Sequence, residues 1–188
     1  MTTDIPDPSA VTRRVGLFPG AGSEARFTTP ATGDERRMLA GFLTAQRATL
    51  ELKCAGLRGE LATASVEPST LSLLGLVRHV TDVERRWFRR AIAGQDAPNL
   101  YSTPDNPEGD FDDAAAADPA AVWAAWRAEA EFADQLLAGA ADLDVTGRDA
   151  WRGTVSLRWV VIHMIEEYAR HNGHADLLRE RIDGTVGV

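Results

Sequence analysis

The sequence has little or nothing of several features that define whole classes of protein. Its 188 residues include one cysteine, Cys54, so the chain can form no intramolecular disulfide and no zinc site built from cysteines. The apolar surroundings LELKCAGL predict a buried, unreactive thiol at this position. No apolar run approaches the roughly 20 residues that a membrane-spanning helix needs. The N-terminus lacks the basic start and apolar core of a secretory signal, so we expect a cytoplasmic protein without a membrane partner.

Positive charge is also scarce. Lysine and arginine together number 20, against 28 aspartate and glutamate residues, which gives a formal net charge of −8. An acidic protein repels phosphate over most of its surface, and this argues against a nucleic-acid partner. Only RRWFRR, residues 85–90, is dense in arginine, and we interpret it as a solvated helix face. No stretch of any length shows the alternating pattern of a β-strand.

What the sequence does contain is helical periodicity in four segments. The first begins near Asp34 and ends near Gly59, and the second follows a cap at Ser69 or Thr70 and ends before Gly94. The third begins with the cap Asp118 and Pro119, and GADLDVTGRDAWRG ends it in a turn-rich crossover. The fourth runs from about residue 155 to about residue 182. We therefore expect an all-α protein with a four-helix bundle.

Two stretches fall outside this pattern. Residues 1–33 carry four prolines and several glycines and are interpreted as an N-terminal arm, which leaves residues 34–188 for the bundle. Residues 95–117 form a long acidic connection with too many turn formers for a regular element. A connection of that length in a small domain is often functional.

Three of the four histidines lie in one dozen residues, HMIEEYARHNGH, from His163 to His174. At about 100° per residue on a helix, His163, Glu167, His171 and His174 lie within an arc of about 80°. Apolar residues before and after them fall in the same arc, so these polar side chains point into the bundle. Measured around the helix from His163, Glu166 lies at about 300° and should face solvent.

A carboxylate in a packed interior is costly unless it is paired. A divalent cation removes that cost, because Glu167 supplies negative charge and His171, four residues later, supplies a neutral nitrogen. The third ligand must come from another helix, and His79 is the one remaining histidine, on the apolar stripe of the second helix. Three protein ligands with one open position are typical of a catalytic zinc site. The alternative is a set of hydrogen-bonded core histidines with an ion pair between Glu167 and an arginine.

Other side chains are weaker candidates. His163 could replace either histidine ligand or face the substrate, and His174 could orient a ligand; both are candidates for proton transfer. Asp82 and Glu84 are interpreted as solvated charges or as partners of the following arginines. Trp151 precedes the fourth helix and is a candidate for the border of a pocket.

The stretches SLLGLVRHVTDVERRWF and SLRWVVIHMIEEYARHNGHADLLRE resemble the DinB-like superfamily, in particular its actinobacterial branch of mycothiol-dependent proteins. The resemblance covers residues 34–183. It implies a four-helix bundle with a crossover connection, often dimeric, that binds zinc or nickel at three residues. The glutamate at position 167 resembles the His-Glu-His triad of the mycothiol-dependent maleylpyruvate isomerase type, so His79, Glu167 and His171 correspond to the ligands. His174 stands where other members have glutamine.

This resemblance implies a function as well. The metal would bind mycothiol and activate its sulfur for transfer to an electrophilic substrate or for isomerisation. Arg78, Arg158 and Arg170 are candidates to meet the carboxylates of a cosubstrate. The alternative function is a non-catalytic, metal-binding stress-response bundle.

Overall fold

The computed structural model describes residue 26 and residues 29–56 and 60–186. Most of the expected N-terminal arm therefore lies outside the described residues. Along the chain the elements are α1 (Glu35–Cys54), α2 (Glu60–Thr63), α3 (Leu73–Glu84), the π-helix η1 (Arg85–Ile92), α4 (Gly109–Asp112), the 3₁₀-helix η2 (Ala114–Ala116), α5 (Pro119–Gly139), β1 (Thr146–Asp149), β2 (Gly153–Ser156) and α6 (Leu157–Asp183).

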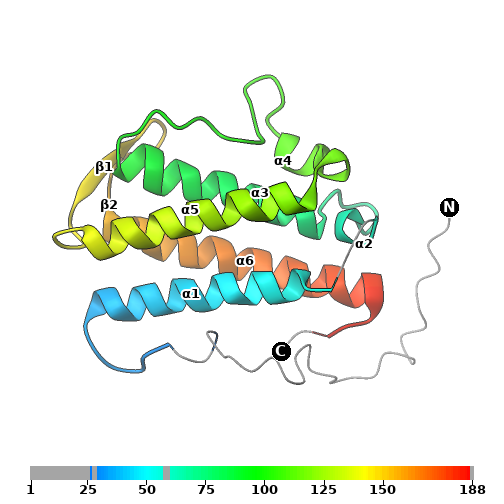
Figure 1. Cartoon of the computed structure of the whole chain (residues 1–188), viewed down its shortest axis with the longest axis horizontal. Helices are drawn as coiled ribbons and strands as arrows, with labels where there is room; N and C mark the ends of the chain where they lie inside the picture. The colour runs from blue at the N-terminus through cyan, green and yellow to red at the C-terminus, as the bar shows by residue number, and fades with distance from the viewer. Residues whose placement is uncertain (1–25, 27–28, 57–59, 187–188) are drawn as a thin grey trace.

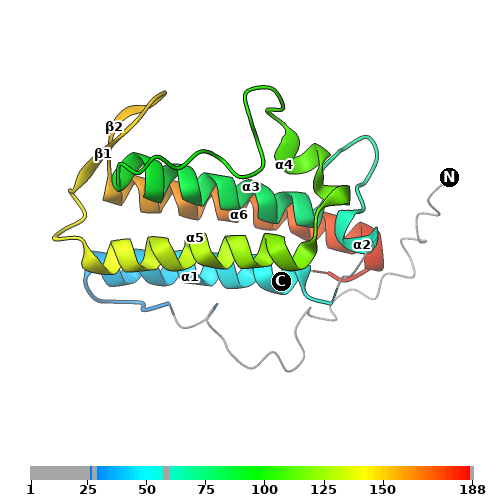
Figure 2. The same ribbon diagram turned by 45° about the horizontal axis from the view of Figure 1, so that its top comes forward.

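Four long helices lie side by side and confirm the expected helical bundle (Figures 1 and 2). Helix α1 packs against α6, and α3 packs against both α5 and α6. A continuous apolar core fills the space between them, with Leu50, Val80, Trp126 and Met164 among its buried members. No helix in the described part of the chain is long and apolar enough to cross a membrane.

The helix starts follow the capping residues in the sequence, with one exception. The side chains of Asp34, Asp118 and Ser156 accept hydrogen bonds from the first turns of α1, α5 and α6, and Pro119 takes the first helical position of α5. The cap of α3 is Ser72, which accepts from the backbone N–H of Gly75. The prediction of Ser69 or Thr70 was therefore wrong by two or three residues, because several hydroxyl residues precede the helix and any of them could cap it.

The prediction that the chain has no strands was also wrong. β1 and β2 pair antiparallel, with Thr146 opposite Ser156 and Asp149 opposite Gly153, and form a small hairpin between α5 and α6. Each strand is only four residues long, too short to show an alternating pattern. The hairpin packs on η1 so closely that a Cβ atom on Gly147 would lie 1.9 Å from the carbonyl oxygen of Ala91. A side chain at this position would push the hairpin off the helix.

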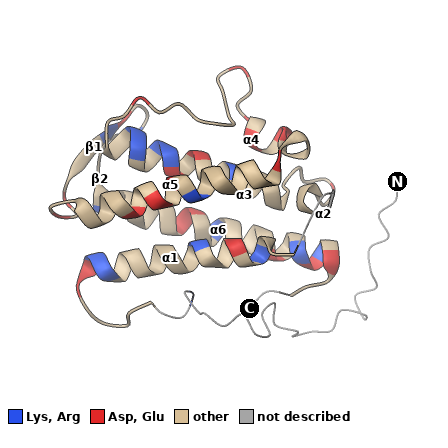
Figure 3. Ribbon diagram, viewed as in Figure 1, with Lys and Arg blue, Asp and Glu red and all other residues tan. Residues whose placement is uncertain are grey.

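The arginines of residues 85–90 are not a solvated face. They lie on η1 at the hairpin end of the bundle, where Figure 3 shows a basic segment. Arg85 and Arg89 both pair with the buried Glu129 of α5, and Arg86 pairs with Asp149 of β1. These ion pairs tie η1 to its two neighbours, so the basic sequence serves the internal structure of the protein.

Asp82 and Glu84 were likewise misassigned as surface charges, since both are buried. Asp82 accepts hydrogen bonds from the backbone N–H groups of Leu100, Tyr101 and Ser102. Its carboxylate therefore holds the beginning of the long connection against α3. On a helical wheel, Asp82 lies at the edge of the apolar face of α3. In the structure the long connection covers this edge, and the sequence pattern does not predict where that connection lies.

Candidate metal centre

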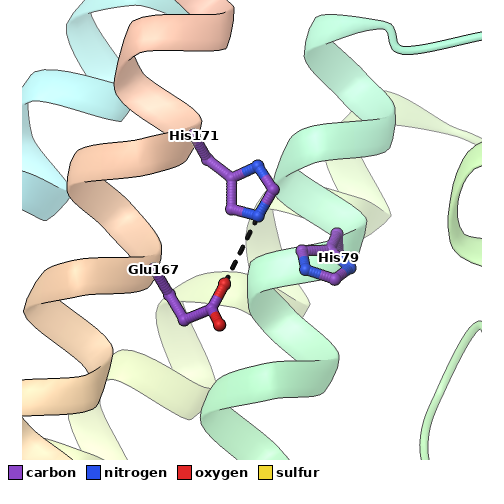
Figure 4. A group of neighbouring side chains, drawn as sticks. All are labelled: His79, Glu167 and His171. Carbon is purple, nitrogen blue, oxygen red and sulfur yellow. Dashed lines mark ion pairs between the residues drawn. The ribbon is translucent and has the colours of Figure 1, made fainter.

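Helices α3 and α6 bring His79, Glu167 and His171 together, as the helical wheel predicted (Figure 4). One potential ligand atom from each residue lies within 4.8 Å of the other two. The side chains of His79 and Glu167 are about a quarter exposed, and that of His171 is 9% exposed. The cluster thus lies at the boundary of the core, where a small molecule can reach it.

The two candidate ligands on α6 have the spacing of ligand atoms around a metal ion. His171 Nε2 lies 3.4 Å from Glu167 Oε2. Two ligand atoms at about 2.1 Å from a tetrahedral zinc ion are separated by about 3.4 Å. The ligand atom of His79 lies within 4.8 Å of those of Glu167 and His171. A nitrogen, nitrogen and carboxylate set is a donor set that zinc accepts.

His79 is held by residues of the long connection. Its Nδ1 lies 2.8 Å from Oδ2 of Asp110, a buried carboxylate of α4, and its ring stacks on Phe111 with centroids 5.3 Å apart. With Nδ1 donating to this carboxylate, Nε2 is the nitrogen left to bind a metal. Sequence reasoning missed Asp110, although a carboxylate that orients a histidine ligand is common in metal sites.

The connection reaches α3 along one helical face. A Cβ atom on Gly75 would lie 2.9 Å from the Phe111 ring, so the glycine permits the close packing of α4. One turn later, the buried guanidinium of Arg78 donates to the carbonyl oxygens of Gly109 and Asp113. The connection of residues 95–117 therefore contributes to the candidate site, since it positions Asp110 next to His79.

His171 is oriented by His174. The two Nδ1 atoms lie 3.3 Å apart, within reach of a hydrogen bond in which one ring donates. This contact leaves Nε2 of His171 directed at Glu167. Partial burial and the nearby His171 lower the pKa of His174, which favours its neutral form. His174 thus lies beside the candidate ligand His171.

Glu167 has two histidine neighbours and no arginine partner among the described residues. Oε1 lies 3.4 Å from His163 Nε2, on the opposite side from His171. Hydrogen bonding with His171, aided by the charge of His163, lowers the pKa of Glu167 against the raising effect of its partial burial. The carboxylate is therefore ionised at neutral pH, and the predicted alternative of an ion pair with arginine is wrong.

His163 lies one helical turn before Glu167 and packs among tryptophans. Its ring stacks on Trp159 with centroids 4.8 Å apart, and the edge of Trp87 meets it at 5.1 Å. His163 therefore lies next to the triad without belonging to the compact group of three. Glu166 is exposed, as the wheel predicted.

Two of the arginines considered as cosubstrate contacts are already engaged. Arg78 donates hydrogen bonds to the backbone of the long connection, and Arg158 forms ion pairs with Glu35 and Asp144. Arg170 is exposed on α6. Cys54 is partly buried rather than fully buried as predicted. Burial raises the pKa of its thiol to about 12, which agrees with the predicted low reactivity.

Comparison with known proteins agrees with this arrangement. The sequence model of a family described as Mycothiol-S-transferase matches residues 38–184, which include α3, α5 and α6, all of α1 after its first three residues, and the whole triad. No curated protein sequence matches the chain.

Proposed function

The chain belongs to the mycothiol-S-transferase family, and from this premise we propose that it is a metal-dependent enzyme that transfers the sulfur of mycothiol to a small electrophile. The observation that carries the proposal is the triad: two histidines and a glutamate from two helices, spaced for a divalent ion and open to solvent on one side. Zinc is the ion that this donor set fits best, and nickel is the alternative.

The residues of the site would have two kinds of role, binding the ion and orienting its ligands. His79, Glu167 and His171 would hold the ion, and Asp110 and His174 would orient the two histidines. When bound, a divalent ion lowers the pKa of a thiol so that it reacts as the thiolate. The thiol loses one proton, the sulfur forms a bond to the electrophilic carbon, and the leaving group departs with the bonding electrons. For an addition or isomerisation, the same thiolate adds to the substrate without a leaving group.

The displaced proton needs an acceptor. His163 lies beside the triad and has no ligand role. Its Nε2, 3.4 Å from the ionised Glu167 carboxylate, donates to it, which leaves Nδ1 as the basic nitrogen. We assign it this role because a neutral imidazole accepts a proton near neutral pH. His174 is a weaker candidate, since its Nδ1 is committed to His171.

Mycothiol consumption with a generic alkylating agent tests the proposal. The zinc-loaded protein should accelerate the reaction, and Glu167→Ala should abolish the acceleration because it removes the anionic ligand. Glu131→Ala, the same substitution at an exposed position on α5, is the matched control and should leave the rate unchanged. Acceleration that survives Glu167→Ala contradicts the proposal, and a protein that binds zinc without any acceleration fits a non-catalytic bundle instead.

A further inference from the structure

The line of ligands on α6 continues toward the hairpin as a line of aromatic rings. Trp159 and His163 precede Glu167 on the same helical face, four residues apart each. Their rings are nearly parallel, with centroids 4.8 Å apart and planes inclined by 17°. Trp87 of η1 meets the edge of the Trp159 ring at 4.9 Å. These rings form a continuous aromatic wall that leads from Glu167 to the hairpin.

The hairpin is fixed over the end of this wall. Arg86 of η1 makes two hydrogen bonds of 2.9 Å to the carboxylate of Asp149. The same carboxylate accepts from the backbone N–H groups of Trp151 and Arg152 in the turn. Together with the tight packing of Gly147 on η1, these bonds hold the turn in one place. The turn residues are therefore positioned in advance for a ligand.

The turn presents a cation beside exposed aromatic surface. The Arg152 guanidinium lies 5.1 Å from the centroid of the Trp159 ring and 5.7 Å from that of Trp151. No carboxylate pairs with Arg152 in the part of the chain that the structure describes, whereas Arg85, Arg86 and Arg89 nearby all have one. Trp151 is 77% exposed. A flat cation stacked on aromatic rings can bind an anionic group with its outer N–H groups and a flat group with its neighbours.

We propose that Trp151, Arg152 and Trp159 form a binding subsite for the electrophilic cosubstrate, and that this subsite takes a flat group with a negative charge, such as an aryl carboxylate. That the ligand reacts as the electrophile rests on the proposed function, but the binding of a flat anion at this subsite does not. Trp159 and Glu167 are eight residues apart, which is about 12 Å along a helix. The cosubstrate should therefore carry its charge roughly 10 Å from the carbon that meets the thiol.

Calorimetric titration of the full-length, zinc-loaded protein tests the subsite without any reaction. The two probes are biphenyl-4-carboxylate and biphenyl-4-carboxamide, which have the same shape and differ in charge. The carboxylate should bind about tenfold more tightly, because a charge-assisted hydrogen bond to arginine is replaced by a neutral one. Arg152→Gln should remove this preference, and Arg152→Lys should keep part of it, since it keeps the charge but not the flat guanidinium.

Arg148→Gln is the matched control. Arg148 is an exposed arginine on β1 of the same hairpin, and its loss changes the net charge by the same amount. The preference should survive in this variant. Equal binding of the two probes to the wild type, a preference that persists in Arg152→Gln, or an equal loss in Arg148→Gln would each overturn the subsite.

The reactive counterparts of these probes separate the two proposals. With 4′-(bromomethyl)biphenyl-4-carboxylate as electrophile, mycothiol sulfur forms the new bond and bromide leaves. Arg152→Gln should raise the KM of this substrate about tenfold and leave the KM of the matching carboxamide and of mycothiol unchanged. If Arg152→Gln raised only the KM of mycothiol, the aromatic wall would bind mycothiol and not the electrophile, and the inference would be overturned. Carboxylate preference in calorimetry without any turnover would refute the proposed function and leave the subsite intact.

Discussion

Asp110 determines which nitrogen of His79 is available for a metal. The hydrogen bond of 2.8 Å to Nδ1 leaves Nε2 as the ligand atom and, through its negative charge, makes the imidazole a stronger donor. The contact spans 31 positions of sequence, from α3 to α4. At the scale of single residues, the candidate site therefore depends on a side chain outside the triad itself.

We expect Asp110→Asn to weaken zinc binding by roughly 10- to 100-fold, because the amide cannot supply the charge that supports His79. The dissociation constant is measured by competition with a chromophoric chelator. Asp112→Asn, an exposed carboxylate on the same short helix, is the matched control and should bind zinc like the wild type. Equal zinc affinity in the Asp110 and Asp112 variants would show that the connection does not support the site.

How far the site could be predicted from sequence depends on where its residues lie. Glu167, His171 and His174 lie on one helix, so the period of 3.6 residues fixes their relative directions. Asp110 could not be found in the same way, because its position depends on how Phe111 of α4 packs on Gly75 of α3. The burial of Glu84 escaped prediction for a related reason: its partner Arg47 lies on another helix.

At the scale of the elements, the hairpin depends on one carboxylate. Hydrogen bonds from Arg86 lower the pKa of Asp149 from 3.8 to about 2, and the backbone N–H groups of Trp151 and Arg152 add to the effect. A carboxyl group with a lowered pKa stabilises the folded state above its unfolded pKa, and that contribution disappears as the pH falls through the folded pKa. The stabilisation from Asp149 should therefore be complete above about pH 5 and decline toward pH 2.

Asp149→Asn should lower the free energy of unfolding by roughly 1 kcal/mol at neutral pH, because the ion pair with Arg86 is partly exposed. At about pH 3 the difference from the wild type should fall to about half, since the wild-type carboxyl is then partly protonated in the unfolded chain. Urea unfolding at the two pH values measures both differences. Asp105→Asn, at an exposed position of the long connection, controls for the change in net charge. A difference that grows on acidification would contradict the role of the Asp149 carboxylate.

The hairpin also shows what a sequence pattern cannot detect. β1 and β2 have four residues each, and their sequences TGRD and GTVS contain only one large apolar residue, Val155. The hairpin is stabilised by contacts with η1, through Gly147 and Arg86, and these contacts join parts of the chain more than 50 residues apart. In contrast, the start of α6 at Ser156 was predictable, because a cap acts within one turn of its helix.

At the scale of the whole molecule, all four long helices meet in one buried hydrogen-bond network. Arg47 of α1 donates to Glu84 of α3, the Tyr168 hydroxyl of α6 donates to the same carboxylate, and Trp126 of α5 donates to Tyr168. Burial raises the pKa of both Glu84 and Tyr168. A buried carboxylate needs all its partners, so the network favours a single arrangement of the helices.

Tyr168→Phe should destabilise the protein by about 1–3 kcal/mol, because it removes a donor from Glu84 and leaves the indole N–H of Trp126 buried without an acceptor. Chemical denaturation measures the change. Tyr101→Phe is the matched control, since the Tyr101 ring lies against Arg78 but its hydroxyl has no partner among the described residues. A loss of stability no larger than that of the control would mean that the network does not join the bundle.

In the proposed function, His79, Glu167 and His171 would hold a divalent ion to which the sulfur of mycothiol would bind. Cobalt can replace zinc in such sites, and its absorption spectrum reports directly on sulfur ligation. We predict that addition of mycothiol to the cobalt-loaded protein produces a sulfur-to-metal charge-transfer band that saturates at one thiol per chain and is absent from Glu167→Ala and His171→Ala. Cobalt that binds without this band, or a band that persists in both variants, would contradict the account.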